Sequence, residues 1–178
     1  QQVIEKIVQR VRQAVAAEQA VITIVEEGQD AAHTLIRAME SSAGRQQFHL
    51  SQALLGWMFL HKRPLLVTDP ASAPELKGIP CEGDVRSLLC VPLMVKSKLI
   101  GVLVACNNKE GAFQEDDQRL LSIIASQSAQ VIENARLAEK DQAIQAQQER
   151  LAAQANEVQE LEARQLREAL ERERLAAQ

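Results

Sequence analysis

The chain has 178 residues, of which 46% are hydrophobic and 2% aromatic, and its formal net charge is −4 at pH 7. This length allows one domain with a core of ordinary size and a further segment. The few aromatic residues disfavour an aromatic cage or a base-stacking surface. The acidic balance, without any basic run, argues against nucleic acid and anionic membranes as main partners.

Three cysteines without Cys-x-x-Cys spacing fit a reducing, cytoplasmic compartment better than a disulfide framework. No stretch approaches ~18 consecutive apolar residues, so we expect no membrane span. The chain starts at Gln1 without a methionine and stops at Gln178 inside a helical pattern. We therefore expect a piece of a longer protein, in which targeting signals would lie outside this chain.

The first part of the chain predicts two helices and four strands. Apolar residues at helical spacing indicate an amphipathic helix over residues 2–17. Its apolar side chains are β-branched, so burial rather than intrinsic propensity must stabilise it. Ser51 is a suitable N-cap for a second helix that extends to about His61. The predicted strands cover residues 20–25, 32–39, 48–50 and 64–67, with a turn at 26–30 and a loop at 40–47.

Residues 68–85 are the longest irregular stretch, with three prolines and two glycines. Loops of this length inside a compact domain are usually functional or mobile. Two almost unbroken apolar segments follow, Ser87–Val95 and Leu99–Cys106, joined by a polar connection at 96–98. They predict a hairpin with both faces covered, by helices of this chain or of a partner.

A single long helix is predicted from Gln114 to Gln178, because this stretch contains neither Gly nor Pro. Its later part has a seven-residue apolar repeat at Leu137, Ile144, Leu151 and Val158. A long helix with one apolar stripe is not stable alone in water, so we predict a parallel two-stranded coiled coil and hence a homodimer. Antiparallel pairing of the fragment is the alternative. Polar residues at Asp141 and Gln148 weaken this seam, and the register shifts after Leu161 as in a stutter.

The hairpin and the start of the long helix also carry a family resemblance. The residues are Val91-Pro92-Leu93, Ile100-Gly101-Val102-Leu103, Phe113 with Asp117 after three intervening residues, and Glu133-Asn134-Ala135-Arg136-Leu137. In this order they resemble the C-terminal half of a GAF domain, and the resemblance extends more weakly back to residue 3.

The resemblance implies an α+β fold, with a central antiparallel sheet and flanking helices, over residues 1–138. Residues 139–178 would then be a coiled-coil signalling helix that leads to an output domain. We expect the dimer contact of the head to be a bundle of the first helix and the 116–138 helix from both subunits.

Asn108-Lys109, Phe113 and Asp117 match most of the Asn-Lys-Phe-Asp-Glu signature of cyclic-nucleotide-binding GAF domains, with Gln118 in place of the final Glu. The resemblance implies that the lysine and the aspartate pair with each other and hold the loop to the helix, without touching a ligand. Generic GAF domains share the phenylalanine and the aspartate. We therefore interpret the four residues as a structural motif and do not expect a cyclic nucleotide.

Cys81 lies six residues before Ser87, a position that resembles that of the catalytic cysteine of free methionine-R-sulfoxide reductases, which are GAF enzymes. The other cysteines of those enzymes lie upstream, whereas Cys90 and Cys106 lie downstream here, and the enzyme's Ser-Glu is Ser87-Leu88. An enzyme also needs a low-pKa thiolate and a resolving thiol. We expect no catalytic residue and keep the reductase as an alternative.

We expect no metal, haem or bilin. The histidines His33, His49 and His61 are scattered, and no second metal ligand is apparent beside them. Bilin attachment in related photoreceptors uses a cysteine followed by an aromatic residue or histidine, and here Cys81 is followed by Glu82.

The resemblance implies a ligand pocket between the 68–85 stretch, the helix carrying Leu54–Leu60 and one face of the sheet. Asp69 and Arg86 are the best candidates for orienting a ligand, because a mostly apolar pocket needs few fixed charges. They have an alternative interpretation as a turn cap and a solvated arginine. The full set of candidate pocket residues is Phe48, Trp57, Asp69, Cys81, Arg86 and Ser87.

These features predict a regulatory domain of a cytoplasmic, bacterial-type signalling protein. It would bind an unidentified small molecule, or respond to another signal, and transmit the change through the coiled coil to an output domain such as a histidine kinase. The competing hypotheses are the Cys81 reductase and a ligand-free dimerisation module whose pocket is filled by its own side chains.

Overall fold

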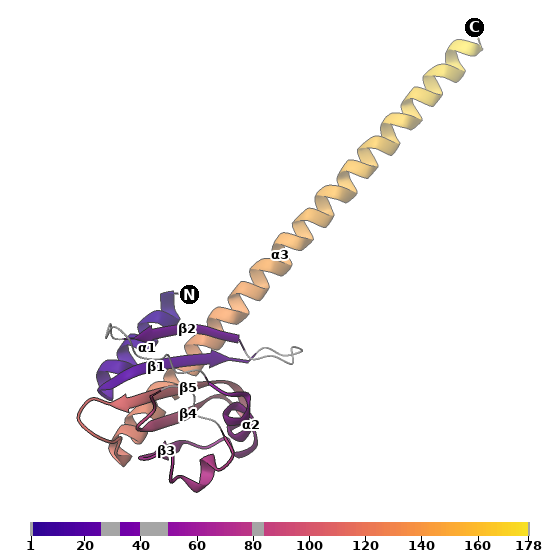
Figure 1. Ribbon diagram of the computed structural model, residues 1–178. Helices are drawn as coiled ribbons and strands as arrows, with labels where there is room; N and C mark the ends of the chain where they lie inside the picture. Colours follow the sequence, from indigo (N-terminus) through magenta and orange to yellow (C-terminus); the bar gives the residue numbers. More distant parts are fainter. Residues whose placement is uncertain (1, 26–32, 40–49, 80–83, 178) are drawn as a thin grey trace. The chain divides into compact units, whose positions relative to one another are not determined.

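The computed structural model describes residues 2–25, 33–39, 50–79 and 84–177 (Figure 1). The chain divides into two compact units, Gln1–Asn134 and Ala135–Gln178. The elements are α1 (Gln2–Ala14), β1 (Ala17–Ile24), β2 (His33–Met39), α2 (Gln52–His61), β3 (Leu65–Val67), the short 3-10 helix η1 (Pro74–Leu76), β4 (Leu88–Val95), β5 (Lys98–Asn108) and α3 (Glu115–Ala176).

The first unit is built on a five-stranded sheet with the order β2-β1-β5-β4-β3. All neighbouring strands are antiparallel. The predicted hairpin is confirmed as β4 and β5, in which Val95 pairs with Lys98 across a tight turn. β5 is the central strand, and it is buried along almost its whole length.

Helices cover both faces of this sheet, as the doubly apolar hairpin predicts (Figure 1). On one face, α1 and the first turns of α3 pack on the sheet, with Val8, Leu121 and Phe113 fully buried. On the other face, α2 and η1 pack through Leu54, Met58 and Leu76. The predicted fold class, an antiparallel sheet with flanking helices and a long C-terminal helix, is therefore confirmed.

The first helix is shorter than predicted. It ends at Ala14 instead of residue 17, and β1 starts at Ala17. Between them Ala16 has a positive φ of 48°, and its carbonyl accepts a hydrogen bond of 2.9 Å from the backbone N–H of Lys109. The chain therefore turns out of the helix to join the sheet, which the apolar periodicity through Val15 does not reveal.

Other boundaries agree more closely. Ser51 is the N-cap of α2, and its side chain accepts a 3.2 Å hydrogen bond from the backbone N–H of Leu54. α2 ends at His61, as predicted. The irregular 68–85 stretch contains η1. The predicted turn at 26–30 and loop at 40–47 lie outside the described residues, as do residues 48 and 49 of the predicted strand, and Leu50 belongs to no strand.

α3 is a single helix of 62 residues that starts one residue after the predicted position and begins with Glu115, Asp116 and Asp117. These acidic side chains lie where the helix dipole favours negative charge. The second unit consists of the later part of this helix and has an exposed apolar stripe, with Leu137, Ile144, Leu151 and Val158 each 50–57% exposed. None of the helices in the described part of the chain has the length and apolar character needed to cross a bilayer.

Candidate functional site

The predicted pocket residues do not form one described site. Phe48 and Cys81 lie outside the described residues. The remaining four are in three places. Trp57 is in α2, Asp69 is near the start of the 68–85 stretch, and Arg86 and Ser87 follow that stretch just before β4.

Trp57 is half-buried on α2 and has partners of its own. Its ring stacks on the His61 ring, with centroids 4.1 Å apart and an interplanar angle of 20°. The guanidinium of Arg63 lies 5.5 Å from the centroid of the indole. The indole is therefore part of a surface stack at the end of α2.

Asp69 is exposed and organises its own turn. One carboxylate oxygen accepts a 3.1 Å hydrogen bond from the backbone N–H of Ala71, and the other accepts a 2.9 Å bond from the hydroxyl of Ser72. This geometry is that of an Asx-type turn cap. It matches the alternative interpretation of Asp69 and leaves its ligand role a prediction.

Arg86 and Ser87 belong to a polar cluster at the end of the 68–85 stretch. The guanidinium of Arg86 forms a 2.7 Å ion pair with Glu18 of β1. Its side chain is 54% exposed, so this pair by itself adds little stability. Ser87 is buried, and its hydroxyl accepts a 3.1 Å hydrogen bond from the backbone N–H of Asn108.

Asn107 is the centre of this cluster. Its side-chain oxygen accepts hydrogen bonds from the backbone N–H groups of Arg86, at 2.7 Å, and Ser87, at 3.3 Å. Its amide nitrogen donates to the backbone carbonyl of Asp84, at 2.6 Å, and to the carboxylate of Glu18, at 3.3 Å. One buried side chain thus connects β1, β5 and the end of the long stretch. We name Glu18, Arg86 and Asn107 the loop anchor.

Asn107 and Glu18 are not among the site residues predicted from the sequence. The available signal was an asparagine at the end of an apolar strand, since asparagine tolerates the left-handed backbone region better than most residues. Asn107 has a positive φ of 57°. Nothing in the sequence links it to Glu18, which lies 89 positions away.

The predicted GAF motif lies next to this anchor. Phe113 is buried against the sheet, and Asn108 donates through its side chain to the carbonyl of Val15 at 3.4 Å. The carboxylate of Asp117 accepts a 2.8 Å hydrogen bond from the backbone N–H of Gln114, at the start of α3. The backbone N–H of Lys109 donates a hydrogen bond to the carbonyl of Ala16, between α1 and β1. All four motif residues therefore lie where the central strand passes into the long helix.

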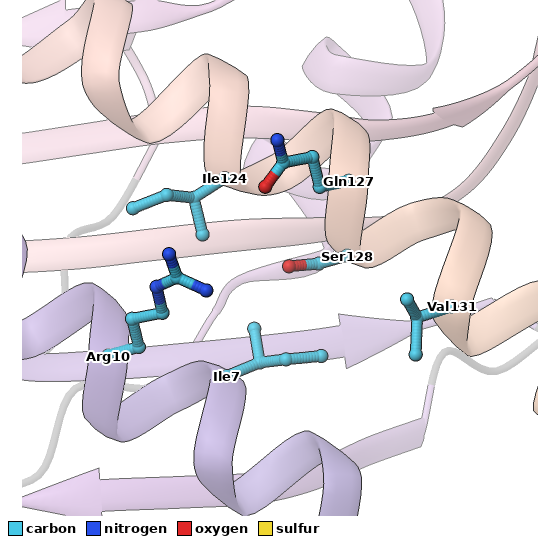
Figure 2. A pocket seen from close by; sticks show the side chains of 6 residues that line it. All are labelled: Ile7, Arg10, Ile124, Gln127, Ser128 and Val131. Carbon is cyan, nitrogen blue, oxygen red and sulfur yellow. The ribbon is translucent and has the colours of Figure 1, made fainter.

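A pocket of about 160 Å³ lies on the face of the sheet opposite α2, between α1 and α3 (Figure 2). Ile7 and Arg10 point into it from α1, and the hydroxyl of Ser128 points into it from α3. It is open and mostly apolar, with one cationic side chain. Its lining residues are Ile7, Arg10, Ile124, Gln127, Ser128 and Val131.

This pocket is not the predicted one, and none of its lining residues was predicted as a site residue. Its chemistry suits an apolar side chain or a small amphiphile better than a reaction, because it holds no nucleophile paired with a base. Within the described part of the chain, no group of three or more His, Cys, Asp or Glu side chains could hold a metal ion.

The sequence matches the family model described as "GAF domain" over residues 1–133. The chain therefore belongs to the GAF domain family. Among curated proteins no match is found.

Many solved structures have the same fold. GAF3 of a Synechocystis protein, in its photoproduct state, is 18% identical with a TM-score of 0.62, covering 79% of this chain and 98% of its own. The GAF domain of an Acinetobacter phosphoenolpyruvate-protein phosphotransferase is 19% identical with a TM-score of 0.59, covering 76% and 91%. The blue-light-absorbing form of the Thermosynechococcus elongatus PixJ GAF domain is 20% identical with a TM-score of 0.57, covering 79% and 89%. At these identities the likeness shows the fold alone.

Proposed function

We propose that this chain is a regulatory sensor domain of a cytoplasmic signalling protein. It responds to a small molecule or another signal on the α2 side of the sheet and transmits the response through a dimeric coiled coil to an output domain. One observation carries the proposal. The helix whose first turns bury Leu121, Ile124 and Ile132 in the core continues as α3 into a segment with an exposed seven-residue apolar stripe. A stripe of this period needs a partner helix.

The head also offers a surface for a second copy. Val3 of α1 and Leu120, Ile123 and Val131 of α3 are 40–57% exposed, on the elements that flank the pocket in Figure 2. Apolar side chains gathered on two adjacent helices support a bundle with the same helices of a partner subunit. In that dimer the pocket between α1 and α3 would receive a side chain of the partner.

The loop anchor supports a route from the ligand side to the dimer side. Asn107 fixes the end of the 68–85 stretch through Asp84 and Arg86. The next residue, Asn108, bonds to the last turn before β1 through Val15. A ligand that displaced the stretch would therefore act on the chain between β5 and α3.

The neighbouring structures support a sensory or regulatory role. They include GAF domains of cyanobacteriochromes, a GAF domain/HD domain protein and the GAF domains of two phosphoenolpyruvate-protein phosphotransferases. The photoreceptors among them stand against the expectation, drawn from Cys81-Glu82, that no bilin binds. Because the shared identity is low, that expectation stays a prediction.

The reductase alternative depends on Cys81, which lies outside the described residues. The two other cysteines, Cys90 and Cys106, are both buried in the core on the α2 side of the sheet. Neither is placed to resolve an intermediate on an exposed thiol without opening this core. We therefore keep the regulatory function as the conclusion.

Native mass spectrometry of the purified chain tests this function. We expect a dimer, and we expect a defined additional mass if a bound molecule survives purification. Adding that molecule to the stripped protein should slow backbone hydrogen exchange in the 68–85 stretch.

Two results would contradict the proposal. One is a chain that stays monomeric at every concentration tested. The other is turnover of free methionine-R-sulfoxide that is lost in Cys81→Ser.

A further inference from the structure

A compact group of cations lies where the end of α2 meets the turn between β4 and β5. His61 is the last residue of α2, Lys62 and Arg63 follow it, and Lys96 and Lys98 flank the turn. The two segments touch, since the ammonium group of Lys62 donates a 3.3 Å hydrogen bond to the carbonyl of Ser97. The two segments lie about 35 positions apart in the sequence, so the sequence contains no basic run that would predict this group. We name Lys62, Arg63, Lys96 and Lys98 the basic corner.

The cations of the basic corner are exposed, and three of them, Lys62, Arg63 and Lys96, form no ion pair in the part of the chain that the structure describes. The helix dipole accounts for cations in the last turn of α2, because it places partial negative charge there. It does not account for Lys96 at the turn. The group is therefore more than a helix cap.

Apolar side chains border the basic corner. Leu60 is 80% exposed and Phe59 is 39% exposed, both in the last turn of α2. The guanidinium of Arg63 lies over the Trp57 ring, so its stem and the indole add a flat, partly apolar surface. Positive charge beside exposed apolar groups is the chemistry that receives a negatively charged segment carrying apolar side chains.

The overall charge decides which anionic partner fits. The chain carries a net charge of −4, so an extended anionic surface such as a membrane or a nucleic acid would repel most of it. A short acidic peptide touches only the basic corner, and charges farther than about 10 Å are largely screened at physiological salt.

We propose that the basic corner and Leu60 form a docking surface for an acidic protein segment, rich in Asp and Glu and carrying one or two large apolar side chains. Such a segment would belong to a partner protein. Its carboxylates meet Lys62, Arg63 and Lys96, and its apolar side chain covers Leu60. The proposal goes beyond the sensory function, because it holds whether or not a ligand binds.

Peptide display against the whole chain tests this surface, with a random peptide library as the probe. The wild type is compared with the double charge reversal Lys62→Glu/Lys96→Glu and with a control, Lys77→Glu/Lys140→Glu, that changes the net charge equally at exposed lysines elsewhere. We expect acidic peptides with Leu, Phe or Trp to be enriched on the wild type and on the control. The double reversal should weaken the best peptide by about tenfold or more, and Leu60→Ser should weaken it as well. Binding should also fall as salt is added.

Three results would overturn the proposal. Enrichment of neutral or basic peptides is the first. Equal affinity for the wild type and the double reversal, within about twofold, is the second. In the third, no peptide of the library is enriched, while vesicles containing phosphatidylserine bind the wild type and not the double reversal. That result would assign the surface to lipid. Thermal melting of each variant confirms that it is folded.

Discussion

Asn107 shows how one polar side chain can hold the end of a loop in place. Its four side-chain hydrogen bonds reach Asp84, Arg86, Ser87 and Glu18. The side chain is 1% exposed, so water cannot replace these bonds. A buried polar group whose partners are removed costs its full desolvation penalty.

We therefore expect Asn107→Ala to lower the free energy of unfolding by about 3 kcal/mol. Two backbone N–H groups would lose their hydrogen-bond acceptor. Alanine also adopts the left-handed backbone conformation of position 107 less readily than asparagine does. Urea unfolding measures the change. Asn134→Ala, at an exposed position on α3, is the control and should change stability by less than about 0.5 kcal/mol. An Asn107→Ala protein as stable as the wild type would show that the loop anchor contributes nothing to stability.

The sequence was least informative about which individual residues form the site. The motif residues Asn108, Phe113 and Asp117 could be selected because a family pattern contains them. Asn107 and Glu18 could not, because their role comes from the register that brings β1 beside β5. The basic corner was missed for the same reason. Each half contains only two or three cations, and only the fold joins them.

At the level of elements, the close contact of β1 and β5 depends on Gly101. A Cβ added there would lie 2.4 Å from the backbone oxygen of Thr23 and 3.2 Å from the Cα of Ile24. Backbone atoms cannot move aside without separating the two strands. Gly56 in α2 offers the opposite case, because nothing lies within 4 Å of its added Cβ.

Gly101→Ala should therefore lower the free energy of unfolding by about 3 kcal/mol or more, and Gly56→Ala should raise it by about 1 kcal/mol through helix propensity. Both variants add one methyl group, so the comparison isolates the surroundings of each glycine. Thermal and urea unfolding give the two values. The opposite order of stability would mean that β1 and β5 do not approach as closely as the structure has them.

Element identity was predictable where the local pattern was strong. The unbroken apolar runs predicted β4 and β5, and the absence of Gly and Pro after residue 113 predicted α3. The end of α1 was not predictable, because Val15 continues the helical period while Ala16 already turns toward β1. The order of the strands came from tertiary contacts that no local pattern contains.

For the molecule as a whole, the open question is whether the apolar stripe of α3 pairs with a second copy. Leu151 lies in the middle of the stripe and is 57% exposed in the single chain. In a parallel coiled coil the two Leu151 side chains would face each other across the seam. Ala153 lies two positions further on, about 200° around the helix, and would face solvent.

Leu151→Glu should therefore place two like charges in an apolar seam, whereas Ala153→Glu should leave them apart on the outer surface. We expect the first variant to weaken dimer association by roughly a hundredfold and the second to change it by less than about threefold. Sedimentation velocity over a range of concentrations measures both. If Leu151→Glu weakens association only in combination with Ile123→Glu, the head contact between α1 and α3 would hold the dimer together and the coil would add to it. If neither variant changes association, the stripe does not form the seam, and transmission through a coiled coil would be wrong.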